Sequence, residues 1–131
     1  MKVGLLGGGR IGGFHAKVLA DHPDVEALLI GDIEPQRAVE VAEAVGGQHS
    51  TVQEVIGLGL DAVAIAAATS AHAELITACL DASLPIFCEK PIALDYEETV
   101  AIVDRVESSE ATLQIGFQRR LDAGHREATP H

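Results

Sequence analysis

Short aliphatic runs alternate with longer segments of helical periodicity along most of this chain, and this alternation is the feature that most constrains its fold. Alternation of this kind is typical of βαβ units, in which helices join parallel strands. The run at residues 61–67, DAVAIAA, is almost wholly apolar, as expected of a strand that helices cover on both faces. The sequence therefore predicts an α/β protein with a mostly parallel sheet.

Six strands and five helices can be placed from the apolar periodicity and the turn residues. The strands are predicted at residues 2–6, 25–31, 48–50, 61–67, 85–88 and 112–117. The helices are predicted at residues 10–21, 34–45, 51–57, 70–82 and 95–108. Right-handed crossovers between such strands produce an open, doubly wound, mostly parallel six-stranded sheet, the Rossmann fold, whose ligand site lies beyond the carboxyl ends of the strands. We expect residues 1–117 to form this one domain and residues 118–131 to form a linker or tail.

The composition excludes several classes of partner. The formal net charge is −11, from 9 Lys and Arg against 20 Asp and Glu. This balance argues against nucleic acid or an anionic membrane as a partner, because phosphate binding needs clustered cations. No apolar run is long enough to span a bilayer, and the chain opens on a strand without a signal peptide, so we expect a cytoplasmic protein. Cys79 and Cys88 lack metal-ligand spacing, so we expect buried, reduced thiols and no metal site.

The hexapeptide GGGRIG follows the first predicted strand and opens the first predicted helix, and it matches the pattern G-x-G-x-x-G. Gly7 would permit the tight turn, Gly9 would let the backbone approach a pyrophosphate, and Gly12 would let the helix pack closely on the strand. Arg10 and Ile11 complete the motif, and the helix N-terminus supplies N–H donors and a partial positive charge. An ordinary glycine-rich turn is the alternative interpretation.

Asp32 ends the second predicted strand, twenty residues after Gly12. At this spacing a carboxylate can accept hydrogen bonds from the hydroxyls of an adenosine ribose, and it repels a 2′-phosphate. The next residue is Ile33 rather than an arginine, so we predict NAD as the cofactor in preference to NADP. The alternative for Asp32 is a helix cap, and Arg37 is expected to be a solvated helix residue outside the site.

The triplet Glu89-Lys90-Pro91 follows the fifth predicted strand, at the sheet edge where ligands bind. A lysine there could orient a hydroxyl or carbonyl group. Proton transfer would require its pKa to be lowered by burial, and a surface ion pair is the alternative.

Several segments resemble the Gfo/Idh/MocA oxidoreductases, and the similarity runs through almost the whole chain. It rests on VGLLGGGRIGGFHAKVLA, GDIEPQRA, AIAAATSAHAELITACLDASLPIFCEKPIALD and LQIGFQRRLDAG, of which the EKP triplet is the most specific part. The resemblance implies that Lys90 contacts the nicotinamide ribose and the substrate, beside Glu89. It also implies that the loop at Ala68, Thr69 and His72 passes the cofactor, although Thr69 could simply cap the following helix.

The remaining matches to the family have structural alternatives. His15 matches a family histidine and is expected to pack or hydrogen-bond within the first helix. Arg119 and Arg120 match a stretch leading toward the substrate side, or they belong to an exposed linker. Asp122 and His125 are expected to be solvated tail residues.

The resemblance implies a second α/β domain that supplies most substrate contacts and the residues assigned to proton transfer, and we expect these 131 residues to contain no counterpart to it. We therefore expect an NAD-binding domain of an oxidoreductase that transfers a hydride between nicotinamide and a sugar or polyol hydroxyl, inactive alone. A non-catalytic dinucleotide-binding or interaction module is the alternative, with self-association into a homo-oligomer as one form of it. A methyltransferase with a similar glycine loop fits the pattern less well.

Overall fold

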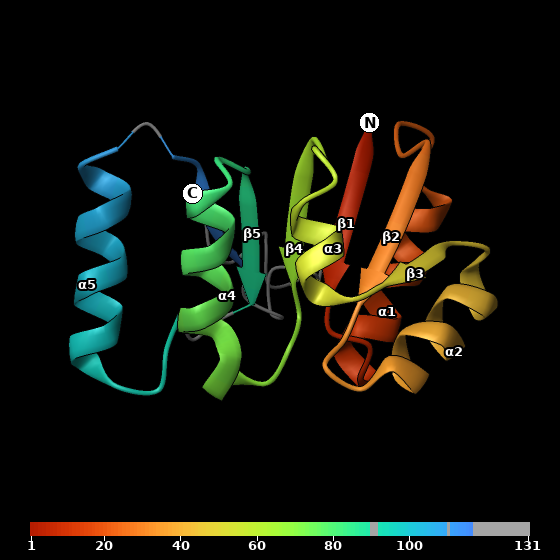
Figure 1. Ribbon diagram of the computed structural model, residues 1–131, viewed down its shortest axis with the longest axis horizontal. Coiled ribbons are helices and arrows are strands. Elements are labelled where there is room, and N and C mark those ends of the chain that lie inside the picture. The colour runs from red at the N-terminus through yellow and green to blue at the C-terminus, as the bar shows by residue number, and fades with distance from the viewer. Residues whose placement is uncertain (90–91, 110, 117–131) are drawn as a thin grey trace, which may run out of the picture.

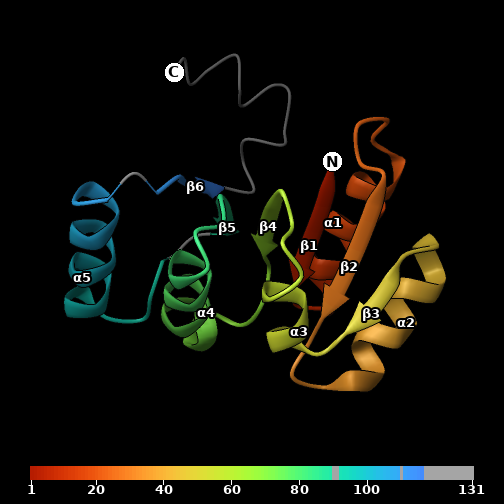
Figure 2. The same cartoon turned by 45° about the horizontal axis from the view of Figure 1, so that its top comes forward.

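The computed structural model describes residues 1–89, 92–109 and 111–116, and its centre is a six-stranded parallel sheet (Figures 1 and 2). The strands are β1 (Lys2–Leu6), β2 (Ala27–Gly31), β3 (Gln48–Ser50), β4 (Ala62–Ile65), β5 (Ile86–Glu89) and β6 (Leu113–Gly116). The helices are α1 (Arg10–Asp21), α2 (Pro35–Val45), α3 (Val52–Ile56), α4 (Thr69–Asp81) and α5 (Tyr96–Glu107). The strands lie in the order β3-β2-β1-β4-β5-β6, and every neighbouring pair is parallel. The predicted doubly wound fold is confirmed.

Most elements differ from their predicted bounds by one or two residues at an end, and β2, β4 and α4 are among them. β2 begins at Ala27 because the N–H of Val25 donates to the carbonyl of His22 (3.1 Å), so Val25 lies in a turn and not in the strand. β4 ends at Ile65, and the chain then leaves the sheet two residues earlier than its apolar composition suggests. α4 correspondingly begins at residue 69. The apolar residues beyond these strand ends, Val25, Ala66 and Ala67, are only partly buried, so apolar composition extends beyond the strands themselves.

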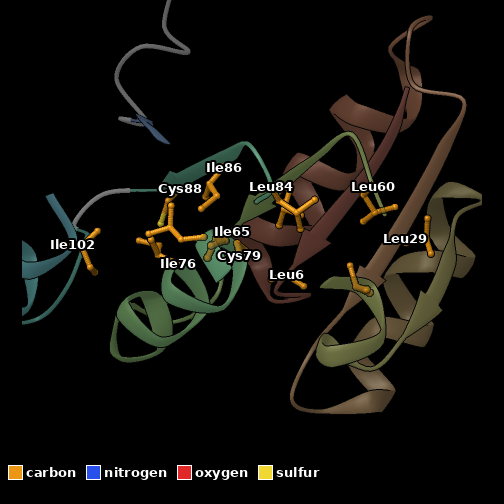
Figure 3. Close-up of a cluster of buried hydrophobic side chains, with 13 residues drawn as sticks. Leu6, Leu29, Leu60, Ile65, Ile76, Cys79, Leu84, Ile86, Cys88 and Ile102 are labelled. Atoms are coloured by element: carbon orange, nitrogen blue, oxygen red, sulfur yellow. The ribbon is translucent and has the colours of Figure 1, made fainter. Parts of the chain in front are cut away.

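Alternate side chains of the central strands point to opposite faces of the sheet and enter two separate cores. Leu5 and Ile30 lie in the core beneath α1 and α2, whereas Leu6 and Leu29 lie in the core beneath α3, α4 and α5. The second core is the larger, and Figure 3 shows its side chains between the sheet and the helices that cover it. The mainly aliphatic core matches a composition with 3% aromatic residues.

Side-chain caps begin two of the helices on that second face. The Thr51 hydroxyl accepts from the N–H of Glu54, whose own side chain accepts from the N–H of Thr51, so the predicted capping box is present at α3. The Asp95 carboxylate accepts from the N–H of Glu98 at the start of α5. A hydrogen bond between the side chains of Asp95 and Glu98, together with the negative charge of Asp95, raises the pKa of Glu98.

Cys79 and Cys88 are both buried, as predicted for small apolar side chains. Burial raises the pKa of the Cys79 thiol to about 11. The thiol therefore stays protonated at neutral pH, and a protonated thiol is a poor nucleophile.

None of the helices in the described part of the chain combines the length and the apolar character that crossing a bilayer requires.

Candidate functional site

Parallel register brings the carboxyl ends of three strands together at the centre of the sheet. Leu6 at the end of β1 lies between Gly31 of β2 and Ile65 of β4. Consecutive connections leave β1 and β4 toward opposite faces here, so this is the switch point at which doubly wound sheets bind ligands. The glycine loop, Asp32 and the loop after β4 therefore meet at one place.

Gly7 occupies a position that only glycine can fill. Its φ is +117°, a conformation that other residues rarely adopt, and its N–H donates to the carbonyl of Gly31 (2.8 Å). A Cβ at Gly7 would lie 2.6 Å from the backbone of Ala66 and Ala67. Gly7 thus makes the expected tight turn, and it packs closely between the end of β2 and the backbone that follows β4.

Gly12 and Gly9 differ in the space that a side chain would have. A Cβ at Gly12 would lie 1.9 Å from the carbonyl oxygen of Gly7, so α1 packs on the end of β1 as closely as the motif predicts. A Cβ at Gly9 would meet no atom within 4 Å. The space over Gly9 is therefore open, which is what the approach of a ligand to the backbone requires.

The N-terminus of α1 presents backbone donors to this space. Gly9 is the N-cap residue, it provides no side-chain cap, and the first turn of α1 contains no acidic residue. The positive end of the helix dipole is therefore not neutralised by the helix itself, an arrangement that favours an anion such as a diphosphate.

Asp32 follows β2 directly, and its carboxylate is held by two backbone donors. Oδ2 accepts from the N–H of Gly8 (2.6 Å), and Oδ1 accepts from the N–H of Glu34 (2.8 Å). The N-cap of α2 is Glu34, not Asp32, so the helix-cap alternative does not describe this side chain. Each carboxylate oxygen can accept more than one hydrogen bond, so both can also accept from ribose hydroxyls.

Gly8 is the residue of this site that the sequence reasoning missed. The motif assigns no task to its second position, yet the N–H of Gly8 orients the carboxylate of Asp32 across a separation of 24 residues. Its place in the motif beside a distant acidic residue is the signal that could have found it.

The imidazole of His72 contacts the backbone of the loop after β4. The imidazole is 1% exposed, and its Nε2 lies 2.9 Å from the carbonyl oxygen of Ala67. Because a carbonyl oxygen only accepts hydrogen bonds, Nε2 is the donor and carries the hydrogen. Ala68 is the N-cap of α4 and has no side chain with which to cap, so Thr69 is the first helical residue and not the cap.

The other predicted site residues are described in part or lie outside the described residues. The backbones of Arg10 and Ile11 belong to α1, and Glu89 ends β5 opposite Gly116. Lys90 lies outside the described residues. So do the tail residues Arg119, Arg120, Asp122 and His125. His15 is half-buried, and its ring contacts those of Phe14 and Phe87 with centroid distances of 5.7 and 6.1 Å, as expected for a packing role.

The strand order, the glycine loop at the switch point and the anchored carboxylate after β2 together define a dinucleotide-binding Rossmann domain. Residues 1–117 match the model of an oxidoreductase family with an NAD-binding Rossmann fold. The chain therefore belongs to the Gfo/Idh/MocA oxidoreductase family, and this confirms the predicted family and its cofactor, NAD.

Curated relatives and solved structures agree with this family. The chain is 39% identical to an inositol 2-dehydrogenase from Rhizobium meliloti over 93% of this chain and 37% of the relative. It superposes with a TM-score of 0.88 on myo-inositol dehydrogenase from Lactobacillus casei in complex with NAD(H) and myo-inositol, at 28% identity over 97% of this chain and 39% of the other. A scyllo-inositol dehydrogenase from Lactobacillus casei with bound NAD(H) gives a TM-score of 0.82 at 27% identity, over 98% of this chain and 40% of the other. The chain thus spans less than half the length of the relatives that it matches.

Proposed function

We propose that this chain is the NAD-binding part of an oxidoreductase that acts on a hydroxyl of a sugar or polyol, and that turnover requires residues beyond those present here. The observation that carries the proposal is the carboxylate of Asp32, which two backbone N–H groups orient beside the glycine loop. Inositol dehydrogenases among the relatives support a cyclic polyol as the substrate class. A cytoplasmic location stays a prediction.

Different residues of the chain would bind different parts of NAD. The backbone at Gly9 and the N-terminus of α1 would hold the diphosphate, with Gly7 and Gly12 keeping the loop close to the sheet. Asp32 would accept hydrogen bonds from the adenosine ribose. Bound NAD supplies the nicotinamide carbon that accepts or donates the hydride.

Residues in the loop after β4 and residues after β5 would act near the nicotinamide end of the bound cofactor. His72 holds the carbonyl of Ala67 and so positions the exposed Ala68 and the half-buried Thr69 at the start of α4, along which the cofactor would pass. Lys90 would orient the substrate hydroxyl beside the nicotinamide ribose, next to Glu89. Arg10 and Ile11 would contribute to the diphosphate loop.

Thermal unfolding of the 131-residue chain with NAD, with NADP and without ligand tests the proposal. A ligand at about 100 times its Kd stabilises a protein by roughly 2.7 kcal/mol, which raises the Tm of a domain this size by several degrees. We expect NAD to raise the Tm and NADP to raise it less. The variant Asp32→Asn should lose most of the NAD shift, because the amide replaces one ribose acceptor with a donor. A Tm that NAD leaves unchanged, or an equal NAD shift in the variant, would contradict this site.

A non-catalytic interaction module is a second candidate, and one observation favours it. Phe14 and Val18, one helical turn apart on α1, are both exposed although both are large and apolar. If this surface drives self-association, sedimentation velocity should show dimers whose fraction falls in a Phe14→Ser/Val18→Ser variant. A monomer at high concentration would rule out self-association through this surface.

A further inference from the structure

Four residues around the start of α2 form a closed ring of contacts. The Asp32 carboxylate accepts from the N–H groups of Gly8 (2.6 Å) and Glu34 (2.8 Å). The Glu34 carboxylate lies 3.3 Å from Nε of Arg37. A Cβ at Gly8 would lie 3.1 Å from the carbonyl oxygen of Arg37 and 3.3 Å from its Cβ, so the stem of Arg37 rests against the glycine loop. The carboxylate of Asp32 and the backbone and Cβ of Arg37 therefore lie beside Gly8, and the Arg37 guanidinium is paired with Glu34.

The position of this ring matters because NADP differs from NAD by a phosphate on the ribose that Asp32 would bind. The Asp32 carboxylate repels that phosphate, and the exposed Ile33 offers it no cation. Arg37 is the cation of the ring, and an arginine is a strong phosphate ligand because its N–H groups match the geometry of phosphate oxygens. In this structure its Nε is engaged by Glu34 instead.

We propose that Glu34 is a second determinant of cofactor choice, which acts by keeping the Arg37 guanidinium from the 2′-phosphate of NADP. The inference rests on the proposed function, since it concerns the same dinucleotide site. Discrimination then has two parts: Asp32 repels the phosphate, and Glu34 occupies the cation that would otherwise attract it.

The pair Glu34–Arg37 is accessible enough to be changed without loss of the fold. The two side chains are 62% and 52% exposed, and exposed ion pairs contribute little to stability. Removing the Glu34 charge should therefore leave the domain folded and alter the local electrostatics alone.

The test is isothermal titration calorimetry of the full chain with NAD and with NADP at low ionic strength. We expect Glu34→Gln to lower the Kd for NADP about fivefold, as a charge interaction over several ångströms in partly solvated surroundings would. The Kd for NAD should change less than about twofold, because NAD has no charge at that position. The double variant Glu34→Gln/Arg37→Gln should return the NADP affinity to that of the unmodified chain.

Glu40→Gln is the matched control, because it removes the same charge further along α2, where Glu40 is exposed and accepts a hydrogen bond from Gln36. We expect this control to leave both affinities unchanged, and the Tm of every variant checks folding.

An unchanged NADP affinity in Glu34→Gln would overturn the inference. So would a gain that persists in the double variant, because Glu34 would then act by repulsion alone. If the unmodified chain binds no NAD, the proposed function fails and the inference with it. That outcome is distinct from NAD binding with no effect of Glu34.

Discussion

Replacing Gly12 with alanine is expected to lower the Tm by roughly 10 °C or more, because overpacking at this site should cost about 3 kcal/mol. A Cβ at Gly12 would lie 1.9 Å from the carbonyl oxygen of Gly7, a separation at which one of the two must move. Gly7 cannot move easily, because its N–H donates to the carbonyl of Gly31 and the backbone of Ala66 and Ala67 leaves no room for even a Cβ on it. Differential scanning calorimetry measures the change.

Gly13→Ala is the matched control for this prediction. The next residue of the same helix has nothing within 4 Å of its Cβ position, and alanine is favoured over glycine inside a helix by about 0.5–1 kcal/mol. We therefore expect Gly13→Ala to raise the Tm slightly while Gly12→Ala lowers it. If the two variants melt within about two degrees of each other, the packing of α1 on the glycine loop described above is wrong.

Ile76→Ala is expected to reduce the free energy of unfolding by about 2–5 kcal/mol, which is a large part of the stability of a domain this size. Ile76 lies on α4 and is 0% exposed, within the core that α4 forms with β4 and β5. Truncation leaves a cavity between helix and sheet that rigid strands cannot close. Urea unfolding should show a lower midpoint with an unchanged slope.

Thr77→Ala serves as the control, since it shortens the exposed, β-branched neighbour on the same helix. Its hydroxyl donates only to the carbonyl of Ala73, one turn earlier in the same helix. We expect a change of less than about 0.5 kcal/mol. Alanine has a higher helix propensity than isoleucine or threonine, so propensity cannot account for a loss in either variant. Comparable losses for Ile76→Ala and Thr77→Ala would therefore contradict the assignment of the stability of α4 to the burial of Ile76 against the sheet.

Local patterns in the sequence predicted most of the fold. The strand at residues 2–6 and the helix at residues 10–21 were placed with the boundaries that the structure has, because apolar periodicity and glycine punctuation are both local there. Errors occur at strand ends such as residues 25 and 67, where the chain is apolar and partly buried but lies outside the strand. Hydrogen-bond pairing depends on a neighbouring strand, which local pattern does not reveal.

The sequence predicted where several residues of the candidate site lie in the fold, but it did not predict which contacts they make. Gly7, Gly12 and Asp32 lie where the motif spacing places them, at the carboxyl ends of adjacent strands. His72 was predicted on a loop that passes the cofactor, and the structure shows that its ring is buried beneath that loop. The family resemblance predicted where His72 lies along the chain, whereas the burial of its ring depends on how α4 packs on β4.

The sequence by itself determined the class of fold, the glycine loop, the carboxylate after the second strand and the cofactor that they favour. Those features follow from spacing along the chain and from the chemistry of single residues. Only the tertiary structure decided that Gly8 orients Asp32 and that Arg37 rests against the glycine loop while paired to Glu34. The contacts of Gly8 with Asp32 and with Arg37 join segments separated by more than twenty residues, and they form because parallel strands bring the ends of β1 and β2 side by side. The pair of Glu34 and Arg37 is local to the first turn of α2.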